Sequence, residues 1–86
     1  MKDWKMKHFG STLKRLRKSR NLTQEGLALK SQLGPKTISL LETDQQEPLL
    51  STLWTLAKSL GMAPSELMRE IEKDVRKTQL LEMQPK

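Results

Sequence analysis

The chain has 86 residues, a formal net charge of +6 and no cysteine. This length fits one small domain, and the lack of cysteine excludes a disulfide framework and a thiolate metal site. No apolar run approaches the roughly 20 residues of a membrane span, and the N-terminal lysines precede no apolar stretch of the kind found in signal peptides. We therefore expect a cytoplasmic protein with no membrane partner.

The positive charge is concentrated at one end of the chain. Residues 1–20 hold eight cations and one acid, a charge of +7, so residues 21–86 sum to −1. A basic end on a near-neutral body favours contact with a polyanion. The alternative is a solvated basic helix, and charge alone is equally compatible with DNA, RNA and anionic lipid.

Hydrophobic spacing predicts five helices and no strand, hence an all-α fold. Residues 1–8 form a basic N-terminal arm. The first helix runs from about Phe9 to Arg20, with Leu13 and Leu16 on its apolar face. Asn21 should end this helix, because asparagine tolerates the left-handed backbone of a helix terminator.

Two short helices follow, joined by a tight turn. Thr23 is predicted to cap the second helix, and Pro35 to begin the third. Proline at the first helical position loses no needed hydrogen bond, and it favours extended backbone at Gly34, where an N-cap residue belongs. Together they form a helix-turn-helix, a motif that places a short helix in the major groove of DNA.

Two further helices complete the predicted domain, which spans residues 9–76. The fourth covers about residues 50–60, and Gly61 should end it. The fifth begins near Pro64 and buries Leu67 and Ile71. Residues 77–86 show little pattern, and we expect them to form a flexible C-terminal tail.

Three motifs follow one another in order along the chain. They are Leu13-x-x-Leu16-Arg17, Leu22-Thr23-Gln24-Glu25-x-Leu27-Ala28 and Thr37-Ile38-Ser39-x-Leu41-Glu42, followed by Pro48, Leu53, Ala57 and Leu60-Gly61. No single motif is specific, but the complete series resembles the Cro/CI-type (XRE family) helix-turn-helix domain of phage repressors and bacterial regulators. The resemblance covers Phe9 to about Leu67 and implies a five-helix bundle like that of lambda repressor.

The resemblance also implies roles for individual residues. It implies that the glutamine opening the second helix binds a DNA phosphate and that the third helix faces the groove. The implied DNA-binding residues are Gln24, Gly34, Pro35, Lys36, Thr37, Ser39 and Leu40. It further implies a structural ion pair between Arg17 and Glu42. Free amides at helix N-termini and a lysine able to contact guanine or phosphate agree with these roles. The alternatives are a solvated Lys36 and a Gln24 that is only a first-turn polar residue.

The chain departs from the family pattern near the predicted groove-facing helix. Gln32 stands where the family often has glycine, so it must adopt a positive φ at a cost of about 1 kcal/mol. Gly34 replaces a frequent serine or threonine. The loop at residues 43–47 is neutral to acidic, where the family often has lysine or arginine. The DNA-facing surface is therefore poorer in cations than usual.

A second surface is predicted on the last two helices. Trp54, Met68, Ile71 and Val75 exceed what a small core needs, and we interpret them as a dimer interface. Two-fold symmetry would place the recognition helices about 34–36 Å apart. The alternative is that Trp54 and Ile71 complete the monomer core.

No constellation for catalysis or metal binding is found. His8 is the only histidine and has no second ligand at metal spacing, and no serine has a histidine partner. We expect no enzyme activity, metal or cofactor. The predicted function is that of a homodimeric, sequence-specific DNA-binding transcriptional regulator on a pseudo-palindromic operator, associated with the nucleoid, with a toxin or polymerase as a further partner. The alternative is an antitoxin-type autorepressor or a protein–protein adaptor with weak DNA affinity.

Overall fold

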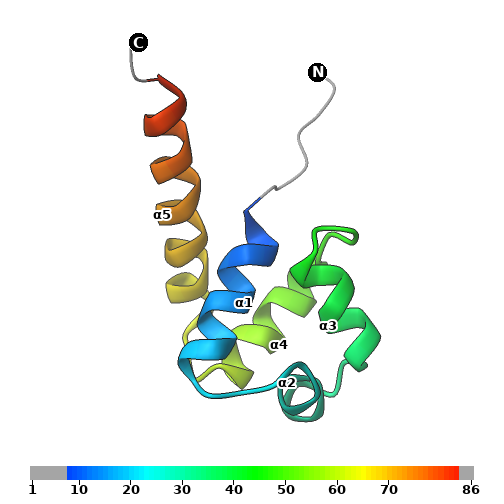
Figure 1. The fold of residues 1–86 in the computed structure, drawn as a ribbon. Helices are drawn as coiled ribbons and strands as arrows, with labels where there is room; N and C mark the ends of the chain where they lie inside the picture. Colours follow the sequence, from blue (N-terminus) through cyan, green and yellow to red (C-terminus); the bar gives the residue numbers. More distant parts are fainter. Residues whose placement is uncertain (1–7, 84–86) are drawn as a thin grey trace.

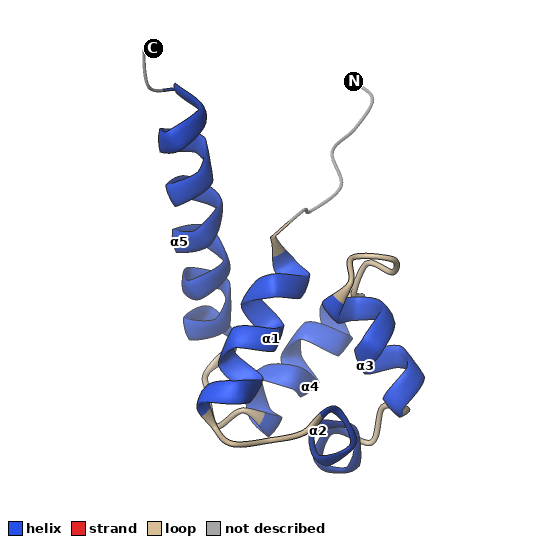
Figure 2. Ribbon diagram, viewed as in Figure 1, coloured by secondary structure: helices blue, strands red, loops and turns tan. Residues whose placement is uncertain are grey.

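The computed structural model describes residues 8–83, and it describes side chains as far as residue 79. The predicted basic arm therefore lies outside the described residues, except for His8, as do residues 84–86 of the predicted tail. The described residues form five helices and no strand (Figure 2). The helices are α1 (Phe9–Ser19), α2 (Gln24–Ser31), α3 (Pro35–Glu42), α4 (Leu50–Ser59) and α5 (Pro64–Met83). The predicted all-α class is confirmed.

The turns between helices use the residues that the sequence pattern singled out. Asn21 after α1 has φ 57°, Gln32 after α2 has φ 61°, and Gly61 after α4 has φ 73°. The Thr23 hydroxyl caps α2 by accepting from the Gly26 amide at 2.9 Å. Gly34 has extended backbone, as the proline after it requires. Local chemistry therefore determines where the short helices begin and end.

The helices surround one apolar core. Figure 1 shows α1 and α4 in the middle, with α5 on one side and α2 and α3 on the other. Each of the five helices contributes a buried apolar side chain. Those with no exposed surface include Leu13, Leu27, Ile38, Leu41, Leu56 and Leu67. Burial of a leucine or isoleucine side chain contributes about 1.5–3 kcal/mol, so this cluster orients the helix-turn-helix against the rest of the molecule.

The fifth helix is longer than the sequence pattern predicted. It continues to Met83, so helix replaces the predicted tail over residues 77–83. Its last turns extend beyond the other four helices (Figure 1). The physical reason is composition, because this segment contains good helix formers and has no glycine or proline before Pro85. Residues 77–83 therefore form helix because of their helix propensity, although the hydrophobic pattern does not extend over them.

A polar contact joins α5 to α1. Arg15 pairs with Glu70 at 3.0 Å and with Asp74 at 3.3 Å, and the buried Thr12 hydroxyl donates to Asp74. The Arg15 hydrogen bond, then that from Lys73, holds the pKa of Glu70 below its ordinary value. Burial alone raises the pKa of Asp74, but hydrogen bonds from Thr12 and Arg15 outweigh it and the net direction is down. Both carboxylates are thus stabilised in their charged form.

Acid should weaken this α1–α5 contact. Because the folded-state pKa values of Glu70 and Asp74 are lowered, the unfolded chain binds protons first as the pH falls. The stabilisation is therefore complete above about pH 4.5, the ordinary value for Glu70, and is lost as the pH drops through the lowered folded values. Thermal denaturation between about pH 7 and pH 2 measures this. The Glu70→Gln/Asp74→Asn double variant should show a shallower acid decline, and an unchanged decline would contradict the assignment.

Candidate nucleic-acid interface

Helix α3 is anchored by one face and open on the other. Ile38 and Leu41 have no exposed surface and hold the helix against the core. Lys36 lies on the opposite side and is exposed. Of the seven predicted DNA-binding residues, three are exposed (Gly34, Pro35, Lys36) and four are half-buried (Gln24, Thr37, Ser39, Leu40). The whole set therefore reaches the surface, around α3 and the start of α2.

The N-terminus of α3 leaves backbone donors open to solvent. Gly34 supplies no side-chain cap, and its carbonyl accepts from the Ile38 amide at 3.1 Å. Pro35 has no N–H, so the amides of Lys36 and Thr37 are the helical donors without a partner within the helix. Free amides combined with the positive end of the helix dipole favour an anion. The Lys36 ammonium adds a full charge at the same end.

Arg17 and Glu42 form the ion pair that the resemblance implied. Arg17 donates to the Glu42 carboxylate through Nε at 2.6 Å and Nη2 at 3.1 Å, and both side chains are buried, with 8% and 2% exposed. A third guanidinium bond, from Nη1 to the Leu22 carbonyl at 2.8 Å, ties the pair to the turn before α2. The hydrogen bond to Glu42 raises the pKa of Arg17 further, so the guanidinium stays charged.

Gln24 belongs to this same network. Its side-chain amide nitrogen donates to Glu42 Oε1 at 3.0 Å. One carboxylate at the end of α3 therefore binds side chains from the start of α2 and from α1. No side-chain N or O buried in the described part of the chain lacks a hydrogen-bond partner. Sequence reasoning gave Gln24 and the ion pair separate roles and did not predict the bond between them.

The acidic loop after α3 contacts the N-terminus of α1. Asp44, with φ 57°, accepts from the Gly10 amide at 2.9 Å, and the residue at the cap of α1, His8, makes no side-chain cap bond. Asp44 therefore caps α1 from a distance, with its negative charge at the positive end of that helix. The sequence contains no local signal for this contact, because cap and helix are 34 positions apart.

Of the four residues predicted for the dimer interface, three reach the surface and one does not. Trp54 is 58% exposed and Met68 44% exposed, and Val75 is partly buried at the edge of the core. Ile71 is only 2% exposed and packs within the monomer core. Its predicted burial is therefore confirmed, and its further assignment to the dimer interface is wrong. The reason is that α5 turns this position toward the other helices. The surface left for a partner consists of Trp54, Met68 and the outer part of Val75.

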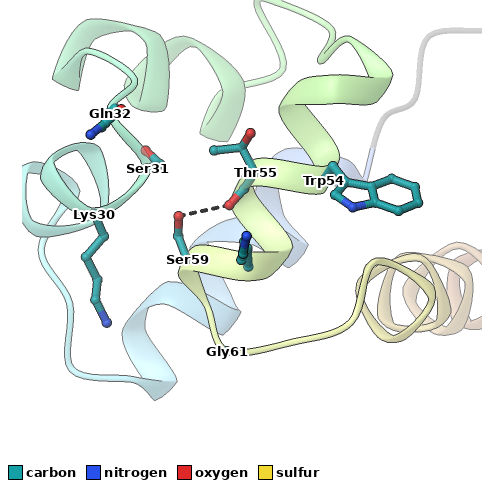
Figure 3. A pocket seen from close by; sticks show the side chains of 8 residues that line it. Lys30, Ser31, Gln32, Trp54, Thr55, Ser59 and Gly61 are labelled. Carbon is teal, nitrogen blue, oxygen red and sulfur yellow. Dashed lines mark hydrogen bonds between the residues drawn. The ribbon is translucent and has the colours of Figure 1, made fainter.

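A hollow of about 540 Å³ lies between α2 and α4. Figure 3 shows Lys30, Ser31, Gln32 and Ser59 around it, with the Trp54 ring pointing away from them. Ser59 donates to the Thr55 carbonyl at 2.9 Å and Ser31 to the Ala28 carbonyl at 3.3 Å. Both hydroxyls bond to carbonyls of their own helices. The hollow adjoins the C-terminal ends of α2 and α4 and is also lined by Lys30 and Lys58. It lies apart from the N-termini that form the candidate interface.

Among residues 8–79, whose side chains the structure describes, no group of three or more His, Asp or Glu residues could hold a metal ion. None of the helices within residues 8–83 is long and apolar enough to cross a membrane.

Comparison with known proteins agrees with this geometry. A helix-turn-helix family model, HTH_3, matches residues 13–67. The HTH-type transcriptional regulator y4dJ of Sinorhizobium fredii is 37% identical over 59 residues, which are 69% of this chain and 77% of that protein. The immunity repressor protein of Bacillus phage phi105 is 39% identical over 61 residues, 71% of this chain but 42% of the repressor.

A solved structure is similar in both sequence and fold. The restriction-modification controller protein C.AhdI from Aeromonas hydrophila is 34% identical with a TM-score of 0.69, and the match covers 72% of this chain and 94% of that one. Family model, relatives and structure together confirm the resemblance seen in the sequence. The chain therefore belongs to the HTH_3 family of helix-turn-helix proteins, the XRE-type DNA-binding transcriptional regulators.

Proposed function

We propose that this regulator binds a pseudo-palindromic operator as a homodimer, with α3 in the major groove of each half-site. The observation that carries the proposal is the position of Lys36, which is exposed on the side of α3 opposite two fully buried anchors. Lysine can contact guanine O6 and N7 or a phosphate. The open amides at the start of α3 would bind the adjacent backbone.

The homodimer rests on a different part of the molecule. The exposed Trp54 and Met68 lie on α4 and α5, away from the N-termini of α2 and α3. Large aromatic and methionine side chains are enriched at interfaces, and a two-fold contact would be isologous, with the same patch on both subunits. Joining two chains there leaves both α3 helices free for DNA.

The acidic loop after α3 gives little support to the alternative of a protein–protein adaptor. An acidic loop after α3 would favour a protein partner over DNA, but Asp44 in that loop accepts a hydrogen bond from the Gly10 amide of α1. Its charge is thereby directed toward a helix N-terminus of the same chain.

Selection of bound duplexes from a random oligonucleotide pool tests the proposed function. We expect one enriched sequence with two half-sites about 10–10.5 base pairs apart, or a multiple of that spacing. Affinity for this duplex should fall steeply with salt. Uniform weak binding to every duplex would support the adaptor, and a single unrepeated half-site would contradict the dimer.

Lys36→Ala should lower affinity for the selected duplex without unfolding the domain. Loss of one lysine contact is expected to cost about 1–3 kcal/mol if it reads a base, and to reduce the slope of log K against log salt by about 1 if it meets a phosphate. Because Lys36 is exposed, the melting temperature should stay close to that of the parent chain. Lys58→Ala, an exposed lysine on α4, is the matched control. Equal losses for the two variants would contradict the assignment of α3.

A further inference from the structure

The Arg17–Glu42 ion pair at the end of α3 stabilises the fold. We propose that Glu42 is also a positioning residue, which orients the amide of Gln24 toward a DNA phosphate. This inference rests on the proposed function. Its basis is the bond from Gln24 Nε2 to Glu42 Oε1 at 3.0 Å, which joins the predicted phosphate contact to a buried, immobile carboxylate.

The chemistry of the carboxylate determines which way the amide faces. Both carboxylate oxygens of Glu42 accept hydrogen bonds from Arg17, so Glu42 offers Gln24 only acceptor atoms. The NH₂ group of Gln24 must therefore face Glu42, and the amide oxygen must face elsewhere. Nε2 carries two hydrogens, and the bond to Glu42 uses one of them. A phosphate is also an acceptor only, so the second hydrogen is the group that suits it.

The surroundings hold this arrangement in place. Glu42 has 2% of its side chain exposed and is bound by two guanidinium nitrogens of Arg17, so it cannot follow Gln24 into solvent. Arg17 also cancels its charge, so the group behind Gln24 does not repel a phosphate. Gln24 is itself half-buried at the first position of α2. A long side chain that is already ordered loses less conformational freedom on binding.

A double-mutant cycle separates positioning from stability. Replacing both charged partners by apolar residues, Arg17→Met/Glu42→Leu, removes the acceptor for Gln24 while leaving no buried charge unpaired, a change that other proteins tolerate. Gln24→Ala is then made in the parent chain and in this background. Affinity for the selected duplex is measured by fluorescence anisotropy, at a temperature where thermal denaturation shows every variant folded. Gln79→Ala, an exposed glutamine on α5, is the matched control.

The expected results differ between the two backgrounds. Gln24→Ala should weaken binding about tenfold in the parent chain, as expected for a hydrogen bond to a charged group. The apolar background should itself weaken binding about five- to tenfold, because Gln24 is no longer ordered. In the apolar background, Gln24→Ala should weaken binding of the duplex by less than about twofold. Since Gln24 and the ion pair carry no net charge, the salt slope should not change in any of these variants.

Each contrary outcome identifies what failed. If the parent chain enriches no sequence, the proposed function fails, and this inference with it. If the parent chain binds its operator but Gln24→Ala has no effect, or costs the same in both backgrounds, the positioning role alone is overturned.

A measurement on the unaltered chain covers the case in which the apolar background does not fold. NMR resolves the two side-chain amide protons of Gln24. On addition of the selected duplex, the proton facing Glu42 should keep its shift and the other should move. Movement of both protons, or of neither, would overturn the inference.

Discussion

Arg17→Met alone should destabilise the domain by about 3–5 kcal/mol, because it leaves a buried carboxylate without its partner. Glu42 retains 2% of its side-chain exposure and accepts two bonds from Arg17, so water cannot replace the guanidinium without opening the core. The same substitution frees the Leu22 carbonyl at the turn into α2. Urea denaturation monitored by circular dichroism measures the loss, which is a large part of the stability of so small a domain.

The double variant Arg17→Met/Glu42→Leu is the control for this prediction. Replacing both partners by apolar residues of similar size is often neutral or stabilising. Its unfolding free energy should therefore recover most of the loss and stay about 1 kcal/mol below that of the parent chain, because the Leu22 carbonyl still lacks the Arg17 hydrogen bond. A single variant that loses less than about 1 kcal/mol would mean that the pair behaves like an exposed one, and the network described here would then be wrong.

Gly10→Ala should cost about 3 kcal/mol, the upper part of the range for overpacking. A Cβ atom at Gly10 would clash with the Glu42 carbonyl oxygen and lie 2.7 Å from the Leu41 carbonyl oxygen. Both are backbone atoms at the end of α3, so no side chain can rotate away. The helix must shift from α1, which also strains the Gly10–Asp44 bond. The melting temperature should fall accordingly.

Gly34→Ala provides the comparison for the substitution at Gly10. The nearest atom to a Cβ there is Thr37 Oγ1 at 4.0 Å, and its backbone, with φ −68°, suits any residue. The loss should stay below about 1 kcal/mol, from the poorer N-cap alone. If the two alanine variants unfold at the same temperature, α1 does not contact the end of α3 as closely as described.

The close contact at Gly10 and the Arg17–Glu42 pair both hold α3 against α1. Both join α1 to the last residues of α3, while Ile38 and Leu41 hold its middle. The first turn of α3, with Lys36, has no comparable anchor and stays open. A rigid helix with a free first turn is the form that groove binding needs, since side chains held in place lose less entropy on contact.

What could be predicted from the sequence is what local chemistry determines. Asn21, Gln32 and Gly61 were expected at helix ends and have positive φ, because that backbone favours few residue types. Thr23 and Pro35 likewise mark the first turns of α2 and α3. Such signals need only neighbouring residues, so a pattern of three or four positions is sufficient.

Contacts between distant segments could not be predicted in the same way. The Asp44 cap on α1 and the bond from Gln24 to Glu42 depend on how the helices pack. The sequence placed Ile71 both on the buried face of the fifth helix and in the dimer interface, and only the packing of α5 decides for the core. The extension of α5 to Met83 was missed because hydrophobic spacing was followed there and helix propensity was not.

The most direct test of the account is an NMR titration of the chain with its selected duplex. We expect the largest amide shift changes at Gln24, Gly34 and residues 36–40, with small changes along the middle of α5. Unchanged shifts at Gly34 and residues 36–40, together with large changes centred on Trp54 and Met68, would contradict it.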